Sequence, residues 1–170
     1  NFQVKNLICL DIGASTGGFT QVLLKNKAKK IYAVDVGTHQ MHESLKKEKK
    51  IISLEKTNAR YLNNKIIPDI IDLIVCDSSF ISLKKVLNSS LTLLDKKKGT
   101  IIALIKPQFE ANKSEIRKGG VVTESSVHQR ICKEIESWFI DECKMKVQGI
   151  IKSPIKGPKG NIEFLIVAQF

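Results

Sequence analysis

Several features are scarce or missing in this chain of 170 residues, and each one excludes a class of protein. No apolar run approaches the roughly 18 residues that a membrane-spanning helix needs, and no signal peptide opens the sequence. The four cysteines are scattered without a C-x-x-C pair, so neither a disulfide framework nor a metal site is expected. We therefore expect a cytoplasmic protein that does not associate with membranes.

Arginine is scarce as well, although the chain is strongly basic. Lys and Arg together number 28 against 17 Asp and Glu, the net charge is +11, and arginine occurs only at positions 60, 117 and 130. A charge of this size favours a polyanionic partner over the alternative of a solvated basic surface. Lysine suits contacts with phosphate, whereas the reading of bases favours arginine. The composition thus predicts binding to a nucleic-acid backbone.

Short apolar runs rich in β-branched residues alternate with segments of helical periodicity. This alternation predicts an α/β fold, a parallel sheet covered by helices on both faces, in one domain. Strands are expected at residues 6–12, 30–36, 50–56, 71–77 and 99–107, with a closing pair at 144–153 and 161–170. Helices are expected at 19–26, after the second strand through about residue 49, at about 83–94 and at about 124–143. The stretch 108–123 lacks both periodicities and is expected to be a functional or mobile loop. Because the first residue is Asn1 and not Met, we expect the sequence to be a piece of a longer protein.

The segment LDIGASTGGFTQ, residues 10–21, joins the first expected strand to the first helix and is compatible with three kinds of site. Its glycines are spaced G-x-x-x-G-G, so the dinucleotide fingerprint fails, and no Lys-Ser or Lys-Thr follows to make a P-loop. Residues 13–17 do match the G-x-S-x-G turn of hydrolases, whose triad would need Asp77 or Asp95 with His128. The hydrolase is disfavoured because His128 lies in a polar helical segment and the turn follows the first strand.

The remaining alternative, a pocket for a methyl donor, uses two acidic residues. Asp11 and Asp35 end the first two expected strands, and a buried carboxylate is costly without a partner. Asp35 follows Gly17 by 18 residues, close to the roughly 20-residue spacing at which an acid accepts ribose hydroxyls. Since no pyrophosphate cradle is evident, an adenosine with a non-phosphate tail fits best, and S-adenosylmethionine is the common one. The alternative role for both carboxylates is loop capping.

Seven segments, spread in order over nearly the whole chain, resemble the TlyA (haemolysin A) family of FtsJ-like ribosomal RNA 2′-O-ribose methyltransferases. They are LDIGASTGGFTQVLL, YAVDVG, EKTNARYL, DLIVCDSSFISL, LIKPQFE, GGVV and SPIKGPKGNIEFL. The resemblance implies a Rossmann-like S-adenosylmethionine-dependent methyltransferase fold, with a mostly parallel seven-stranded sheet in a single domain of residues 1–170. It also implies S-adenosylmethionine as cofactor and ribosomal RNA or ribosomal subunits as partner. An N-terminal S4-type RNA-binding domain, usual in the family, is expected outside this sequence.

The resemblance assigns site residues as well. The glycine turn would hold the methionine part of the donor, Asp35 the ribose, and Asn58 with Ala59 the adenine. The family's catalytic set, Lys-Asp-Lys-Glu, is matched in its last three members by Asp77, Lys106 and Glu163. Its first lysine is expected upstream of this sequence. The candidate donor-binding residues are therefore Asp11, Gly13, Ser15, Gly17, Asp35, Asn58, Ala59 and Asp77.

The chemistry agrees with three catalytic residues near the ends of separate strands. Methylation of a ribose 2′-hydroxyl is a direct displacement that needs alignment and help in removing a proton. We favour positioning and charge stabilisation as the role of Lys106, whose extended conformation Pro107 promotes. Base action, and simple pairing with Glu163, are the alternatives.

The residues that follow the fourth strand indicate the acceptor. The sequence DSSF, residues 77–80, stands where amide-nitrogen methyltransferases often carry N-P-P-Y, which favours an oxygen acceptor. Phe80 could equally stack on a nucleobase or fill the core. Two rival functions stay open: a non-catalytic RNA-binding module with this fold, because the first lysine is missing, and a membrane-active haemolysin, suggested only by the family's name.

Overall fold

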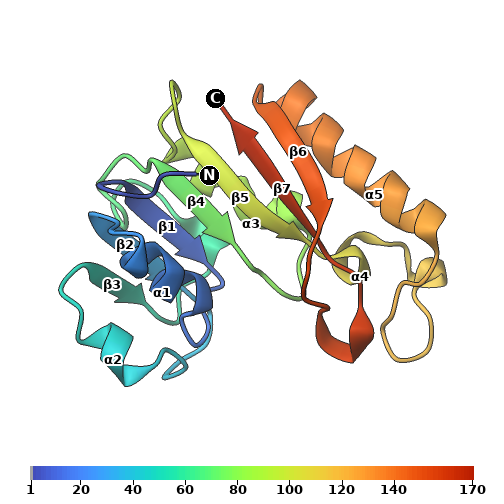
Figure 1. The fold of residues 1–170 in the computed structure, drawn as a ribbon, viewed down its shortest axis with the longest axis horizontal. Helices are drawn as coiled ribbons and strands as arrows, with labels where there is room; N and C mark the ends of the chain where they lie inside the picture. The colour runs from blue at the N-terminus through green and yellow to red at the C-terminus, as the bar shows by residue number, and fades with distance from the viewer. Residues whose placement is uncertain (1) are drawn as a thin grey trace.

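A single sheet of seven strands organises the chain. The computed structural model describes residues 2–170, so that Asn1 lies outside the description. The strand order is β3-β2-β1-β4-β5-β7-β6; the pairs among β1 to β5 are parallel, while β7 runs antiparallel to both β5 and β6 (Figure 1). The strands are β1 (Ile8–Ile12), β2 (Lys30–Val34), β3 (Ile51–Leu54), β4 (Leu73–Cys76), β5 (Thr100–Ile105), β6 (Lys146–Lys152) and β7 (Phe164–Gln169). The mostly parallel, seven-stranded architecture predicted from the sequence is confirmed.

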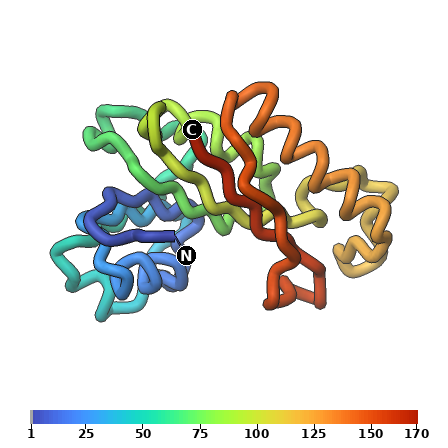
Figure 2. Tube along the Cα trace, turned by 45° about the horizontal axis from the view of Figure 1, so that its top comes forward, coloured from blue at the N-terminus to red at the C-terminus, as the bar shows by residue number. Residues whose placement is uncertain are grey.

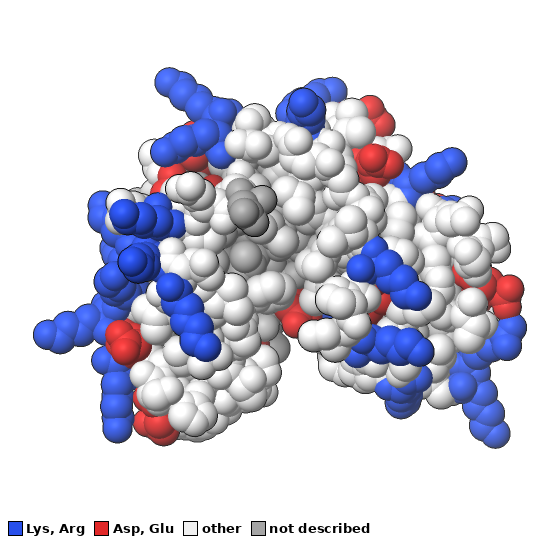
Figure 3. Space-filling view, in the orientation of Figure 1, with Lys and Arg blue, Asp and Glu red and all other residues white. Residues whose placement is uncertain are grey.

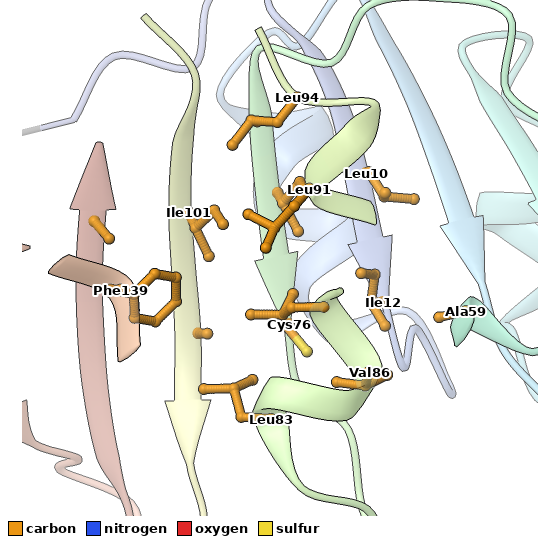
Figure 4. Packing of buried hydrophobic residues seen from close by; sticks show 14 of the residues in the cluster. Leu10, Ile12, Ala59, Cys76, Leu83, Val86, Leu91, Leu94, Ile101 and Phe139 are labelled. Carbon is orange, nitrogen blue, oxygen red and sulfur yellow. The ribbon is translucent and has the colours of Figure 1, made fainter. Parts of the chain in front are cut away.

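Helices cover both faces of the sheet, as expected for central parallel strands. On one face Leu23 of α1 (Gly18–Lys25) and Leu45 of α2 (Glu43–Lys46) pack with Cys9 and Val75 of the strands. On the other face lie α3 (Leu83–Leu87), the 3₁₀ turn Ser90–Thr92 and α5 (Ser125–Ser137), with Leu10, Ile12, Cys76 and Ile101 beneath them (Figure 4). Strand residues therefore alternate between two apolar layers.

The cover is uneven at the β6 side of the sheet. In Figure 1, α1 lies over the β1–β2 part of the near face, whereas β7 and β6 stand in front without a helix over them. Side chains of that near face, such as Leu104, Leu165 and Val167, are only half-buried, and Ile151 is 64% exposed. The expectation of helices on both faces thus holds for the central strands and not for the whole sheet, within residues 2–170.

Helix lengths differ most from the sequence-based expectation. The charged helix expected up to about residue 49 is only the four-residue α2, and the one expected at 83–94 divides into α3 and a 3₁₀ turn. The long helix ends its α-helical part at Ser137 and continues as a π-helical turn, Trp138–Glu142.

The expectation of a loop at 108–123 holds only in part. The short helix α4 (Pro107–Glu110) begins there with proline at its first position, where the missing N–H costs nothing. A 3₁₀ turn at Lys113–Glu115 follows, closed by reciprocal hydrogen bonds between Asn112 and Glu115. Among residues 2–170, no helix has the length and apolar character needed to cross a membrane.

Candidate active site

A cavity of about 460 Å³ opens where β1, β2 and β4 end, which we call the carboxyl edge of the sheet. Ligands of open α/β sheets bind at this edge. In Figure 3 the molecule is notched at its lower side, where these strands end in Figure 1. Six of the eight candidate donor-binding residues line the cavity: Gly13, Ser15, Asp35, Asn58, Ala59 and Asp77.

The glycine turn is held against the end of β4. Gly13 has φ +80°, and a Cβ atom there would lie 2.5 Å from the backbone oxygen of Asp77. A side chain at this position would therefore both strain the backbone and force the two strand ends apart. Glycine is required here because two backbones approach each other at the wall of the cavity.

Asp35 is fixed by two backbone amides. The N–H of Ser15 donates to its Oδ2 at 2.8 Å, and the N–H of Gly37 donates to its Oδ1 at 2.7 Å. These bonds tie the end of β2 to the glycine turn and orient the carboxylate. Each carboxylate oxygen accepts more than one hydrogen bond, so Asp35 keeps the capacity to accept hydroxyls of a ligand.

The far wall of the cavity is formed by the start of the 3₁₀ turn Ala59–Tyr61. The side chain of Asn58 accepts a hydrogen bond from the N–H of Arg60 at 3.0 Å and caps this turn. Ala59 is buried beside it, packed in the same core as Ile12 and Val34. Both residues predicted to lie by the adenine therefore belong to one rigid corner.

Two of the predicted donor-binding residues lie away from the cavity wall. Gly17 has φ +103°, and a Cβ atom there would lie 2.3 Å from Cδ1 of Leu45, so that this glycine serves the packing of α1 against α2. Asp11 is fully buried, and its Oδ2 accepts a hydrogen bond from the Thr20 hydroxyl at 2.6 Å. Its Oδ1 is buried without a hydrogen-bond partner among the described residues. Burial raises the pKa of Asp11 from 3.8 to about 6.

We expect Asp11→Asn to change how stability depends on pH. Because the folded state raises this pKa to about 6, the folded protein holds a proton that the unfolded chain releases, and the wild type loses stability as pH rises from about 4 to above 6. The free energy of unfolding of Asp11→Asn minus that of the wild type should therefore rise by roughly 3 kcal/mol over this window. Urea unfolding at several pH values measures this difference. Asp141→Asn, on the exposed surface, is the control, and a pH-independent difference for Asp11→Asn would refute the assignment.

The candidate catalytic residues Asp77 and Lys106 form an ion pair at the carboxyl edge. Lys106 follows β5 in an extended conformation, is only 8% exposed, and its Nζ lies 2.6 Å from Oδ1 of Asp77, which follows β4. The same ammonium group donates a hydrogen bond to the Ser79 hydroxyl at 3.1 Å. A buried ammonium group with a carboxylate and a hydroxyl on it is held in one direction. Sequence reasoning had not singled out Ser79 for this contact.

Glu163 lies at the same edge but is held by other partners. It precedes β7, is 6% exposed, and its Oε1 accepts a hydrogen bond from Nε2 of Gln108 at 3.0 Å. A Cβ atom at Gly157 would lie only 2.1 Å from that oxygen, so the turn at Gly157 packs closely against the carboxylate and leaves no room for a side chain. Among the described residues the ion pair of Lys106 is with Asp77, and the alternative of a Lys106–Glu163 pair is not observed. Gln108 and Gly157 were missed by the sequence-based analysis.

The hydrolase triad considered for Ser15 is not assembled. Nε2 of His128 lies 3.0 Å from the backbone oxygen of Val122, and the His128 ring packs edge-on against Phe164. His128 is 6% exposed, whereas the sequence had suggested a polar position. Asp77, one proposed triad acid, is engaged with Lys106. The G-x-S-x-G letters at this turn are therefore coincidental.

Phe80 stands at the mouth of the cavity. It is 91% exposed, has φ +65°, and its ring lies 5.2 Å from that of Phe109 at an angle of 48°. The alternative that Phe80 fills the core was wrong. The exposed ring of Phe80, which packs on the half-buried Phe109 beside the cavity, offers a flat apolar surface to a ligand.

Comparison with known proteins identifies the family of this chain. The family model of FtsJ-like methyltransferases matches residues 1–170. The chain is 44% identical over 167 residues to "Hemolysin A" of Brachyspira hyodysenteriae, and the aligned region covers 96% of this chain and 68% of that protein. It is 40% identical over 158 residues to "16S/23S rRNA (cytidine-2'-O)-methyltransferase TlyA" of Mycobacterium tuberculosis (strain H37Rv), with 93% of this chain and 58% of that protein covered.

A solved structure gives the same result. A protein of Streptococcus thermophilus, solved as a candidate hemolysin, has a TM-score of 0.94 and 40% identity over 99% of this chain and 61% of that one. The chain thus spans about three fifths to two thirds of the length of these relatives. On these matches, the chain belongs to the FtsJ-like methyltransferase family, in the branch that includes the hemolysin A and TlyA proteins.

Proposed function

We propose that this protein transfers a methyl group from S-adenosylmethionine to a ribose 2′-hydroxyl of ribosomal RNA. The observation that carries the proposal is the ion pair of Lys106 and Asp77, which lies at the edge of the donor-sized cavity. The TlyA relatives are named as cytidine-2′-O-methyltransferases of ribosomal RNA, which supports both the acceptor atom and the substrate.

The residues around the cavity suit S-adenosylmethionine. Asp35 offers a fixed carboxylate to ribose hydroxyls, the glycine turn lets the backbone approach the donor, and Asn58 with Ala59 borders a slot for the adenine. When bound, the donor supplies an electrophilic methyl group on a sulfonium. Asp77 lines the cavity and also contacts Lys106, so it links the donor site to the catalytic site.

The chain's own groups position the acceptor. The ammonium group of Lys106 points to the carboxyl edge and can hold the 2′-oxygen by a hydrogen bond, while Asp77 and Ser79 keep that ammonium in place. The exposed ring of Phe80 provides a stacking surface for a nucleobase, a contact worth roughly 1–3 kcal/mol per base. Holding the base and the 2′-oxygen together would align the ribose for displacement.

The net charge of +11 agrees with RNA as the partner. All seven strands belong to one sheet, and on that ground we propose that residues 1–170 act as one methyltransferase domain. We also propose a cytoplasmic location, because a protein that methylates ribosomal RNA must reach ribosomes or their subunits.

Methyl transfer from labelled donor to intact ribosomal subunits, by the full-length protein, tests this function. We expect label in the RNA that depends on the protein. Donor binding measured by calorimetry without any transfer would instead support a non-catalytic RNA-binding module. The absence of both donor binding and methyl transfer would refute the proposal.

Replacing Asp35 by alanine should weaken donor binding. The change removes the carboxylate that both receives ribose hydroxyls and ties the glycine turn to β2 through two amides. Hydrogen bonds to a charged group contribute about 1.5–3 kcal/mol each, so we expect at least a tenfold loss of affinity for S-adenosylmethionine by calorimetry. Asp95→Ala, at the opposite edge of the sheet, is the matched control. Equal affinities for the Asp35 variant and the wild type would exclude Asp35 from the donor site.

A further inference from the structure

Two tight turns project at the carboxyl edge of the sheet (Figure 2). The first, residues 117–120, is closed by hydrogen bonds from the N–H of Gly120 to the oxygen of Arg117 and from the N–H of Arg117 to the oxygen of Val121, both 2.9 Å. The second, residues 157–160, is closed by a bond of 3.1 Å from the N–H of Gly160 to the oxygen of Gly157. We call residues 117–120 and 157–160 the twin turns.

Asn161 joins the twin turns. This residue is 3% exposed, and its side chain forms hydrogen bonds only with backbone groups. Oδ1 accepts from the N–H of Val122 at 3.1 Å, and Nδ2 donates to the backbone oxygens of Gly120 at 3.0 Å and Pro158 at 3.2 Å. A buried amide satisfied on both sides fixes the groups that it contacts. Two segments about forty residues apart in the sequence thus form one rigid feature.

The twin turns carry three exposed lysines that form no ion pair among residues 2–170. Lys118 lies in the first turn, and Lys159, with Lys156 next to it, belongs to the second; all three side chains are exposed. Of the acidic residues near the first turn, Glu124 pairs with Arg117 and Glu115 pairs with Arg130. Within residues 2–170 the three lysines form no ion pair. Figure 3 shows basic side chains standing on the lower right of the molecule, over the segments that hold the twin turns in Figure 1.

The second turn is in direct contact with the catalytic centre. The backbone of Gly157 packs on the carboxylate of Glu163. That carboxylate accepts a hydrogen bond from the side chain of Gln108, which follows Lys106 by two residues. An RNA chain whose target ribose lies at Lys106 can leave the site past Glu163 and Gly157, where Lys156 and Lys159 are exposed. Lysine is suited to phosphate contacts that carry no sequence information.

We propose that the twin turns grip the phosphates of the single-stranded RNA that flanks the target nucleotide. The grip rests on the proposed function, because it takes Lys106 as the place of the target ribose. Its contribution is electrostatic and independent of sequence, so that the turns fix the path of the backbone while the cavity and Phe80 receive donor and base. Asn161 is the positioning residue that holds Lys118 of the first turn at a fixed place relative to Lys156 and Lys159 of the second.

The triple variant Lys118→Gln, Lys156→Gln, Lys159→Gln tests the grip in the full-length protein. Its control is Lys29→Gln, Lys49→Gln, Lys97→Gln, which removes the same charge from exposed lysines just before β2, β3 and β5, at the opposite edge of the sheet. Binding is measured to a short single-stranded RNA and to purified ribosomal subunits over a range of salt concentrations. Loss of three phosphate contacts should lower the slope of log affinity against log salt by about 2 for the short RNA. The control should change it by less than half as much, and both variants should bind S-adenosylmethionine like the wild type.

The outcomes separate this inference from the proposed function. Unchanged RNA binding by the twin-turn variant, or an equal loss in both variants, would overturn the grip even if the wild type methylates RNA. A selective loss of RNA binding by the twin-turn variant, in a protein that transfers no methyl group, would refute the proposed function and with it the grip on RNA that flanks a target nucleotide, and would leave the twin turns only as an RNA-binding surface. Asn161→Ala should reproduce part of the twin-turn loss while all three lysines are present, and wild-type RNA binding by a folded Asn161→Ala protein would show that the turns need no coupling.

Discussion

Replacing Lys106 by methionine is expected to slow methyl transfer severely while donor binding is retained. Methionine preserves the unbranched apolar stem that fits the buried path after β5, but removes the ammonium group that contacts Asp77 and Ser79. Groups that position or relay a proton in a transition state contribute about 10²–10⁴-fold in rate. We therefore expect the single-turnover rate to fall at least a hundredfold, with calorimetry showing the affinity for S-adenosylmethionine within threefold of the wild type.

Two further variants give the Lys106 result its meaning. Lys97→Met, an exposed lysine just before β5 at the opposite edge of the sheet, removes the same charge away from the site and should keep the wild-type rate. Lys106→Arg retains the charge with a different geometry. Partial activity of this variant would indicate that Lys106 acts by electrostatic stabilisation. No activity would indicate that the rate depends on the exact position of the hydrogen-bonding ammonium group. A rate for Lys106→Met within tenfold of the wild type would show that another group holds the acceptor oxygen.

Gly157→Ala is expected to lower activity through Glu163, although Gly157 is not a candidate catalytic residue. The backbone of Gly157 has φ −70°, which alanine adopts without strain, so the new methyl group itself is the only perturbation. That methyl would lie 2.1 Å from Oε1 of Glu163, and the carboxylate must move away from its hydrogen bond with Gln108. We expect kcat to fall about 10–100-fold, since a misplacement of about 1 Å can cost that much, with little change in the KM for the donor.

A double-mutant cycle with Glu163→Ala tests this route. If Gly157 acts only through the carboxylate, adding Gly157→Ala to Glu163→Ala should cause no further loss of kcat, and the two effects should be strongly non-additive. Additive effects, with a lower thermal midpoint for Gly157→Ala, would instead show that the alanine disturbs the turn at 157–160 as a whole.

The sheet was predictable from the sequence because its strands carry a strong local signal. Runs such as residues 6–12 and 71–77 are almost wholly apolar, as buried parallel strands must be, and each contains an observed strand. Helix lengths were less predictable: the lysine-rich stretch after Val36 lacks an apolar stripe beyond Leu45, so only α2 forms there. The short helix at Pro107 depends on the proline and not on periodicity.

The candidate site was predicted in part, for a physical reason. Residues at strand ends, such as Asp35, Asp77 and Lys106, are brought together by the topology of a parallel sheet, and their meeting follows from the order of the strands. Gln108 contacts Glu163 across 55 positions of sequence, and such a contact follows only from the three-dimensional packing. Asp11 was predicted to line the donor cavity because it lies at a strand end. Its side chain is instead buried and accepts a hydrogen bond from Thr20.

The position of the transferred methyl group tests the central claim most directly. Ribosomal subunits are incubated with the full-length protein and labelled S-adenosylmethionine, the RNA is digested to nucleosides, and the labelled nucleoside is identified by mass spectrometry. The site built on Lys106, Asp77 and the donor cavity predicts a 2′-O-methyl nucleoside, and no label when the target nucleotide is replaced by its 2′-deoxy form. A methyl group on a base, or transfer that persists to the 2′-deoxy nucleotide, would contradict it.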